Sequence, residues 1–373
     1  MKITLIGPVY PYRGGIAHFT TLLAQKLREN GHEVQIISFK KQYPQWLYPG
    51  ESDKDYSETR EKVDADFVIT PFNPLTWNKT IKLINNHCPD KVIIPWWVTF
   101  WGPCFRFILS HLKRQGIVTV GLIHNVVPHE AKVLDHWITK WALEQADHFV
   151  VMTNKEKARL QEILTKVKRI DVVPHPIYQQ FVPTGKDRAE IQKDLGLPKG
   201  KKYVLFFGFV RPYKGLMDLI DSFKLVNEKD RNIHLIVAGE FWGDRNQYVQ
   251  RIQELGIQNI VHLFEKYIPD DEAAQFFEVS DLFVAPYTGG TQSGAAKMAL
   301  GFGLPIVITD VIIDELLAGL PERCTIVPAK SPKGLAIAVI NNISQPNLDP
   351  DEITTLIQKG WDSLINAIIR STK

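Results

Sequence analysis

Two cations stand three residues apart in the stretch "FGFVRPYKG", which runs from Phe207 to Gly215. Arg211 and Lys214 follow the apolar run "YVLFF", typical of a buried parallel strand, and precede a helical segment. Cations in this position either belong to an ordinary solvent-exposed loop or bind an anion. Arginine offers a rigid fork of donors and lysine a compact point charge, so the pair suits the two phosphates of a diphosphate.

A second loop, in the stretch "APYTGGTQSGAAKM", could bind an anion through its backbone. Gly290 allows a tight turn, and Thr291, Gln292 and Ser293 come just before a helical run with no charge until Lys297. The exposed amides of a helix start, with two hydroxyls and a carboxamide nearby, form an anion site. The alternative is that Thr291 or Ser293 is only a helix N-cap. The cations on a neighbouring strand-end loop favour a diphosphate.

Strands alternate with helices along most of the chain. The first series of Val/Ile-rich runs is "KITLIGP", "EVQIISF", "DFVITP", "KVIIPW", "VTVGLIH" and "HFVVMT". After a Pro/Gly/Lys-rich stretch the alternation restarts with "YVLFFG", "IHLIVAG", "NIVHLF", "DLFVAP" and "PIVIT". The pattern predicts two α/β domains, each a doubly wound, Rossmann-like parallel sheet.

We place the domains at residues 1–176 and 177–351, and expect a last helix at about 352–373 to pack back on the first domain. Ligands of open α/β sheets bind at the carboxyl ends of the strands, near helix N-termini. Both domains are therefore expected to turn those ends toward a shared cleft.

Composition excludes several classes of protein. A chain of 373 residues is too long for one ordinary core, and 45% hydrophobic with 23% charged residues is typical of globular proteins. The 44 basic and 41 acidic residues leave +3, too balanced for a nucleic-acid-binding footprint. Cys88, Cys104 and Cys324 give neither a disulfide framework nor metal-ligand spacing, which indicates a reducing cytoplasm.

One aromatic stretch, from Trp96 to Lys113, raises the question of a membrane. Pro103 and Arg106 are among the residues that interrupt its apolar run, so it falls short of a spanning helix. The favoured interpretation is a buried core strand and helix. The alternative is an aromatic and basic surface for peripheral contact with the inner face of a membrane. The N-terminal "MKITLIGPVYP" is interpreted as a first strand rather than a signal segment.

Together, several motifs carry a resemblance to a known family. The early "RGG" loop, "FGFVRPYKGL", the Tyr267-Ile268-Pro269 loop before an acidic helix start, and "ALGFGLPIVITD" occur in the order found in GT-B glycosyltransferases. More specifically, the chain is similar to the family-4 retaining sugar transferases, over nearly its whole length. The resemblance implies the GT-B fold, two Rossmann-like domains facing a cleft.

It also implies roles for residues around the donor. The equivalents of Arg211 and Lys214 hold the donor's diphosphate, and the Gly14-Gly15 loop approaches the donor phosphate from the first domain. His124, at the end of a strand, corresponds to a histidine near the transferred sugar. A purely structural histidine is the alternative at that position.

The nucleobase and the acceptor are assigned to other loops. In the family, backbone atoms of the loop that matches Tyr267 and Ile268 contact the nucleobase. The acceptor is expected on the first domain, with Tyr12, Arg13 and His18 near its entrance.

The chain departs from the family at one point. Two Glu residues eight positions apart usually precede "GLPIVITD", and the second commonly bonds the donor ribose. Here its place falls on Lys297 or Met298, and that of its partner on Gly289 or Gly290. The range 282–309 contains no carboxylate. The "TQSG" stretch resembles a variant branch of the family, which suggests that the donor is bound differently and not that the enzyme is inactive.

The expected function is transfer of a sugar from a nucleotide-sugar donor to a glycan or lipid-linked acceptor, with retention implied by the resemblance, in envelope polysaccharide or glycolipid synthesis. No Asp-x-Asp motif stands at a strand end, and "ESDKD" is interpreted as a solvated loop, so neither metal nor cofactor is expected. Two other enzyme classes share the GT-B fold. A nucleotide-sugar epimerase would need carboxylate bases in the cleft and a phosphorylase would need a lysine that binds pyridoxal phosphate, and neither feature is evident in the sequence. A module that binds a nucleotide-sugar without turnover is the non-enzymatic alternative, motivated by the absent carboxylates. The residues do not identify the donor nucleotide, the sugar or the acceptor.

Overall fold

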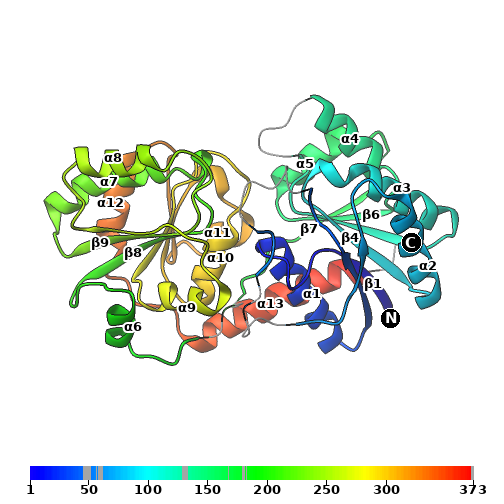
Figure 1. The fold of residues 1–373 in the computed structure, drawn as a ribbon, viewed down its shortest axis with the longest axis horizontal. Coiled ribbons are helices and arrows are strands. Elements are labelled where there is room, and N and C mark those ends of the chain that lie inside the picture. Colours follow the sequence, from blue (N-terminus) through cyan, green and yellow to red (C-terminus); the bar gives the residue numbers. More distant parts are fainter. Residues whose placement is uncertain are drawn as a thin grey trace. The chain divides into compact units, whose positions relative to one another are not determined.

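The structure is a computed structural model that describes residues 1–44, 52–55, 57, 62–127, 133–166, 168–178, 181 and 183–370. The last residues of the C-terminal helix expected from the sequence, 371–373, lie outside the described residues. The chain divides into two compact units (Figure 1). The first contains the described residues up to Pro174, apart from Ser57, together with those from Lys359 onward. The second contains Ser57 and His175–Gln358.

The first unit is built on a parallel sheet in the order β3-β2-β1-β4-β5-β6-β7. Its strands are β1 (Lys2–Ile6), β2 (Glu33–Phe39), β3 (Asp66–Ile69), β4 (Lys91–Trp96), β5 (Val118–Ile123), β6 (His148–Val151) and β7 (Arg169–Val172). Strands β4 and β6 are buried along their whole length, because helices cover both faces of the sheet. The strand order reverses beside β1, as in a doubly wound sheet.

Helices cover the two faces of this sheet. They are α1 (Gly15–Glu29), α2 (Pro74–His87), α3 (Gly102–Arg114), α4 (Val133–Leu143), α5 (Asn154–Ile163) and the end of α13 (Pro350–Ile369). In Figure 1, α4 and α5 lie above the strands of this unit and α1 and α13 below them. The α3 helix packs between α2 and α4. Trp361 of α13 packs on Phe19 of α1, and Lys91 Nζ donates to the carbonyls of Ile368, Ile369 and Arg370, which caps the last turn of α13.

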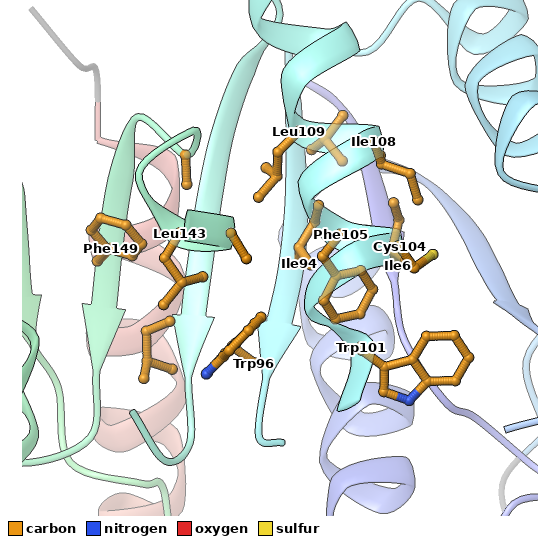
Figure 2. Close-up of a cluster of buried hydrophobic side chains, with 14 of the residues drawn as sticks. Ile6, Ile94, Trp96, Trp101, Cys104, Phe105, Ile108, Leu109, Leu143 and Phe149 are labelled. Carbon is orange, nitrogen blue, oxygen red and sulfur yellow. The ribbon is translucent and has the colours of Figure 1, made fainter. Parts of the chain in front are cut away.

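The core between α3 and the sheet answers the question raised by the aromatic stretch. Trp96, Trp101 and Phe105 are at most 1% exposed, and Figure 2 shows them packed between the helix and the strands. The interpretation as a core strand and helix therefore agrees with the structure. Trp97, Phe100 and Phe107 are only partly buried, at the edge of this core, and peripheral contact with a membrane stays a prediction. Within the described part of the chain, no helix combines the length and apolarity needed to span a bilayer.

The second unit has a parallel sheet in the order β10-β9-β8-β11-β12-β13. Its strands are β8 (Lys202–Phe207), β9 (Ile233–Ala238), β10 (Val261–Phe264), β11 (Leu282–Ala285), β12 (Ile306–Thr309) and β13 (Cys324–Val327). Its helices are α6 (Arg188–Asp194), α7 (Leu216–Lys229), α8 (Asn246–Glu254), α9 (Asp270–Glu278), α10 (Gly294–Gly301), α11 (Glu315–Ala318) and α12 (Pro332–Asn342). The predicted class, two doubly wound α/β sheets, is confirmed.

Candidate functional site

The cation loop of the second unit connects β8 to α7. A short 3₁₀ helix, Pro212–Lys214, carries Lys214, and Arg211 immediately precedes it. Gly215 ends this turn with a φ of 71°, and a Cβ there would lie 1.8 Å from the Pro286 carbonyl oxygen. Only glycine allows this close approach, which presses the cation loop against the end of β11.

Aromatic rings, rather than carboxylates, surround the two cations. The Arg211 guanidinium lies 4.2 Å from the centre of the Trp242 ring, and Lys214 Nζ lies 5.6 Å from that of Tyr287. In the described part of the chain neither cation forms an ion pair. Burial, and then the charge of Arg211, lower the pKa of Lys214. An anion bound here would relieve both effects, because it would favour the charged form of the lysine.

The loop between β11 and α10 packs directly on the cation loop. The backbone N–H of Thr288 donates to the Tyr213 carbonyl at 2.7 Å, and the Thr288 hydroxyl donates to the same oxygen at 3.3 Å. A Cβ on Gly289 would lie 3.6 Å from the Cβ of Tyr213. The structure thus brings together the two loops that the sequence places at neighbouring strand ends.

Ser293 is the N-cap of α10. Its hydroxyl accepts a hydrogen bond from the Ala296 N–H at 3.2 Å and donates toward the Tyr287 hydroxyl at 3.3 Å. Ser293 and Thr291 are 2% and 4% exposed, whereas Gln292 is half-buried. Burial raises the pKa of Tyr287 to about 12, so this phenol stays protonated at neutral pH. The helix-cap interpretation holds for Ser293, and binding of an anion by this loop stays a prediction.

Three aromatic rings gather at the carboxyl ends of β8, β9 and β10. The ring of Phe209 lies 4.4 Å from that of Trp242 and 6.4 Å, nearly parallel, from that of Tyr267. Ile268, the next residue after Tyr267, is buried at 5% exposure. Sequence reasoning selected Tyr267 and Ile268 but missed Phe209 and Trp242. The signal that could have found them is an aromatic residue just after each of three consecutive strands. Flat, partly exposed rings of this kind can stack on a nucleobase.

His124 follows β5 in the first unit, and its side chain is only 2% exposed. Its backbone N–H donates to the Trp96 carbonyl at 2.9 Å, and its ring packs edge-on against Phe19 of α1, with the centres 4.9 Å apart. Two residues later, the Val126 carbonyl accepts the Trp96 indole N–H at 3.0 Å. These contacts hold the His124 loop firmly to the sheet.

The start of α1 offers open backbone amides. Gly14 is its N-cap, with a φ of 99°, no side chain caps the helix, and the first turn contains no acidic residue. A Cβ on Gly14 or Gly15 would meet nothing within 4 Å. Such an uncovered helix N-terminus favours an anion.

The residues expected near the acceptor are largely built into the first unit. Tyr12 is 1% exposed, and its hydroxyl donates to the Phe39 carbonyl at 2.8 Å. His18 is 7% exposed on α1, and Arg13 is half-buried, with its N–H donating to the Asp53 carbonyl. Of the three, Arg13 presents the largest share of its surface. The assignment to an acceptor stays a prediction.

Lys297 occupies one of the two positions where the family places its second Glu. Its side chain is fully buried, and Nζ lies 2.8 Å from each carboxylate oxygen of Asp314. Asp314 also caps α11 by accepting the Leu317 N–H at 2.9 Å. Met298, the other position, is 8% exposed. This ion pair lies in the interior of the unit, so the position where the family has its second Glu presents no carboxylate to a ligand. Among the described residues, no group of three or more His, Cys, Asp or Glu side chains could hold a metal ion.

Comparison with known proteins places this geometry in a family. Residues 13–180 match the model described as Glycosyltransferase Family 4, and residues 201–345 match that described as Glycosyl transferases group 1. An uncharacterized glycosyltransferase of Methanocaldococcus jannaschii is 23% identical, over 83% of this chain and 81% of that protein. The lipopolysaccharide core biosynthesis mannosyltransferase LpsB of Rhizobium meliloti is 30% identical, over 42% of this chain and 46% of its own length.

A solved structure shows the same fold. Anabaena HepE in complex with UDP matches with a TM-score of 0.65 at 14% identity, over 99% of this chain and 95% of that one. The two family matches between them span most of the sequence. The chain is therefore a glycosyltransferase of the GT-B type, with a Glycosyltransferase Family 4 domain in its first half and a Glycosyl transferases group 1 domain in its second.

Proposed function

We propose that this glycosyltransferase moves a sugar from a nucleotide-sugar donor to a glycan or lipid-linked acceptor, with retention and without a metal ion. The observation that carries the proposal is the pair Arg211 and Lys214. Both are held by packing against aromatic rings, beside the start of α10, and neither forms an ion pair with a described carboxylate. A diphosphate supplies the missing negative charge.

The two cations would act mainly on the leaving group. When the bond between sugar and phosphate breaks, negative charge builds on the nucleoside diphosphate. Cations fixed before the reaction stabilise that charge without reorganising, which lowers the barrier more than it tightens donor binding. The amides at the start of α10 add a fixed dipole at the same place. We assign Gly14 and Gly15, at the open start of α1, a parallel role toward the donor phosphate.

The other donor contacts follow from the aromatic cluster and from the resemblance. Phe209, Trp242 and Tyr267 suit a nucleobase, which would stack on their faces while the backbone around Ile268 contacts its edge. HepE was solved with UDP and with UDP-glucose, which supports a nucleotide-sugar as donor. We place His124 near the transferred sugar, on the strength of the family resemblance.

The acceptor and the setting rest on relatives. The name of LpsB attaches it to the lipopolysaccharide core, which favours a role in cell-envelope polysaccharide or glycolipid synthesis. Cys88, Cys104 and Cys324 are free thiols, which suits a protein that works on the cytoplasmic side of the membrane. Arg13, the half-buried residue beside the start of α1, is the group we favour for acceptor contact.

A donor screen tests the proposal. The protein is incubated with UDP-, GDP- and ADP-sugars, and calorimetric binding and slow donor hydrolysis are followed with and without EDTA. We expect one nucleotide class to bind and to be hydrolysed at a rate that EDTA leaves nearly unchanged. Loss of hydrolysis in EDTA, with rescue by Mg²⁺ or Mn²⁺, would show that a metal takes part. Binding with no nucleotide release, even with a pool of lipid-linked and soluble acceptors, would favour a non-catalytic binding module.

A further inference from the structure

Helix α4 is apolar on two opposite sides. Its inner side packs on the first unit: Ala142 and Leu143 are buried, and Ile138 lies against Gly102 of α3. Its outer side carries four large apolar side chains, which we call the outer stripe of α4. They are Val133, Leu134, Trp137 and Trp141, exposed by 88, 64, 58 and 36%. A helix that is apolar on both sides normally has both sides covered, so the outer stripe calls for a partner.

The stripe is ordered before any partner arrives. The rings of Trp137 and Trp141, one turn apart, stack with their centres 5.7 Å apart and their planes 9° from parallel. Arg106 of α3 lies over Trp141 at 5.4 Å and donates through Nη1 to the Trp141 carbonyl at 2.9 Å. The aromatic surface is therefore fixed to a cation on the neighbouring helix.

Helices α3 and α4 carry more cationic than acidic side chains. Lys140 lies on α4 itself, and α3 carries Arg106, Lys113 and Arg114 with no acidic residue. The single carboxylate of α4, Asp135, accepts a hydrogen bond from Thr99. Aromatic side chains flanked by arginine and lysine are the composition that settles at the boundary between lipid headgroups and acyl chains.

The helix is also tied to the His124 loop. The Thr139 hydroxyl, on the inner side of α4, donates to the Val126 carbonyl at 3.2 Å. The same carbonyl accepts the Trp96 indole N–H, two residues after His124. A surface on which α4 rests would thus lie one helix thickness from the loop that carries a candidate catalytic residue.

We propose that the outer stripe of α4 docks onto a lipid bilayer that contains anionic headgroups. The helix has 11 residues, about 16 Å, far too short to span, so it lies in the plane of the interface with its tryptophans among the acyl chains. Arg106 and Lys140 face the headgroups. This inference builds on the proposed function, since a lipid-linked acceptor is met at such a surface. It also extends the membrane contact from the stretch Trp96–Lys113, which contributes Arg106, to the next helix along the chain (Figure 1).

Vesicle flotation of the full-length protein tests the docking. Vesicles of phosphatidylcholine, with or without phosphatidylglycerol, contain neither donor nor acceptor, so the result does not depend on whether the protein transfers sugar. We expect the wild type to float with the phosphatidylglycerol vesicles, and less so at high salt. Leu134→Ser with Trp137→Ser should weaken binding at least tenfold, because two large apolar side chains no longer enter the acyl region. Lys140→Gln should weaken binding about fivefold on anionic vesicles only.

Matched controls separate docking from folding. Leu225→Ser with Ile337→Ser removes two exposed apolar side chains from helices of the second unit, 40 and 51% exposed, and should leave flotation unchanged. Trp137→Phe should keep most of the binding, and all variants should melt at the wild-type temperature. The proposal is overturned by a wild type that does not float, or by a stripe variant that floats as well as the wild type. It is also overturned if the protein self-associates in solution through the stripe, which would make the stripe an interface between copies.

Discussion

Two lysines of the second unit show how differently one fold can treat the same charge. Lys297 is fully buried on α10, and its Nζ lies 2.8 Å from both carboxylate oxygens of Asp314. Lys214 lies near the start of α7 against the ring of Tyr287 and forms no ion pair with a described residue. Burial lowers the pKa of both lysines. The Asp314 carboxylate counteracts this for Lys297, whereas for Lys214 Tyr213 counteracts it and the charge of Arg211 lowers the pKa further.

The difference separates a charge that is paired within the fold from one that is available to a ligand. A lysine whose charge is paired inside the fold has little to offer a ligand, and removing one partner of the pair destabilises the fold. A part-buried lysine beside a second cation costs the free protein stability and regains it when an anion binds. A buried lysine at the end of a strand is thus a weak indication of a binding site, and a buried lysine without a carboxylate partner is a stronger one.

The largest expected effect comes from breaking the structural pair. Lys297→Met leaves the Asp314 carboxylate buried without its cation and should lower the free energy of unfolding by about 3–5 kcal/mol. Urea denaturation measures this directly. Adding Asp314→Ser should restore most of the loss, because serine still caps α11 and no charge is left buried. If Lys297→Met proved as stable as the wild type and lost only donor binding, Lys297 would belong to the site.

Removing the unpaired cations should affect turnover rather than folding. Arg211→Ala and Lys214→Ala should each reduce kcat/KM on the order of 10²-fold, the scale for losing one group that stabilises charge in the transition state. Neither removes a partner from a described ion pair, so the melting temperature should change little. Lys224→Ala, at an exposed position of α7, is the matched control and should leave both quantities unchanged. Wild-type turnover in either Arg211→Ala or Lys214→Ala would contradict the assignment of these residues to the diphosphate.

The fold was predictable wherever strands are buried on both faces. Runs such as "YVLFF" and "IHLIVA" became β8 and β9 because a covered parallel sheet requires continuous apolar sequence. Two edge strands escaped prediction. The sequence of β7, "RIDV", is half-exposed and charged, and β13, "CTIV", is buried only at its ends. Edge strands need less apolar sequence, so their pattern resembles that of a loop.

The candidate site was predictable only as far as strand ends mark it. The loops of Arg211 and Ser293 could be paired because neighbouring parallel strands end at one edge of a sheet. The stacking of Phe209 on Trp242 and the pairing of Lys297 with Asp314 join residues that no local spacing connects. The outer stripe of α4 was missed for a related reason: an apolar helix with both sides filled is taken as core until its neighbours are known.

The smallest expected effect concerns the cap of α10, where backbone and side chain can be told apart. If the amides at the helix start hold the donor phosphate, the Ser293 hydroxyl acts only as a cap. Ser293→Ala should then lower the free energy of unfolding by about 1 kcal/mol and raise the donor Kd no more than about fivefold. Ser331 is a matched control, since its hydroxyl caps α12 by accepting the Gly334 N–H at 3.2 Å. Ser331→Ala should cost a similar amount of stability and leave donor affinity unchanged. Thermal melts beside calorimetric donor titrations measure both quantities. A hundredfold loss of donor affinity in Ser293→Ala, with Ser331→Ala unaffected, would mean that the hydroxyl itself binds the phosphate and that α10 contributes through its cap rather than through its amides.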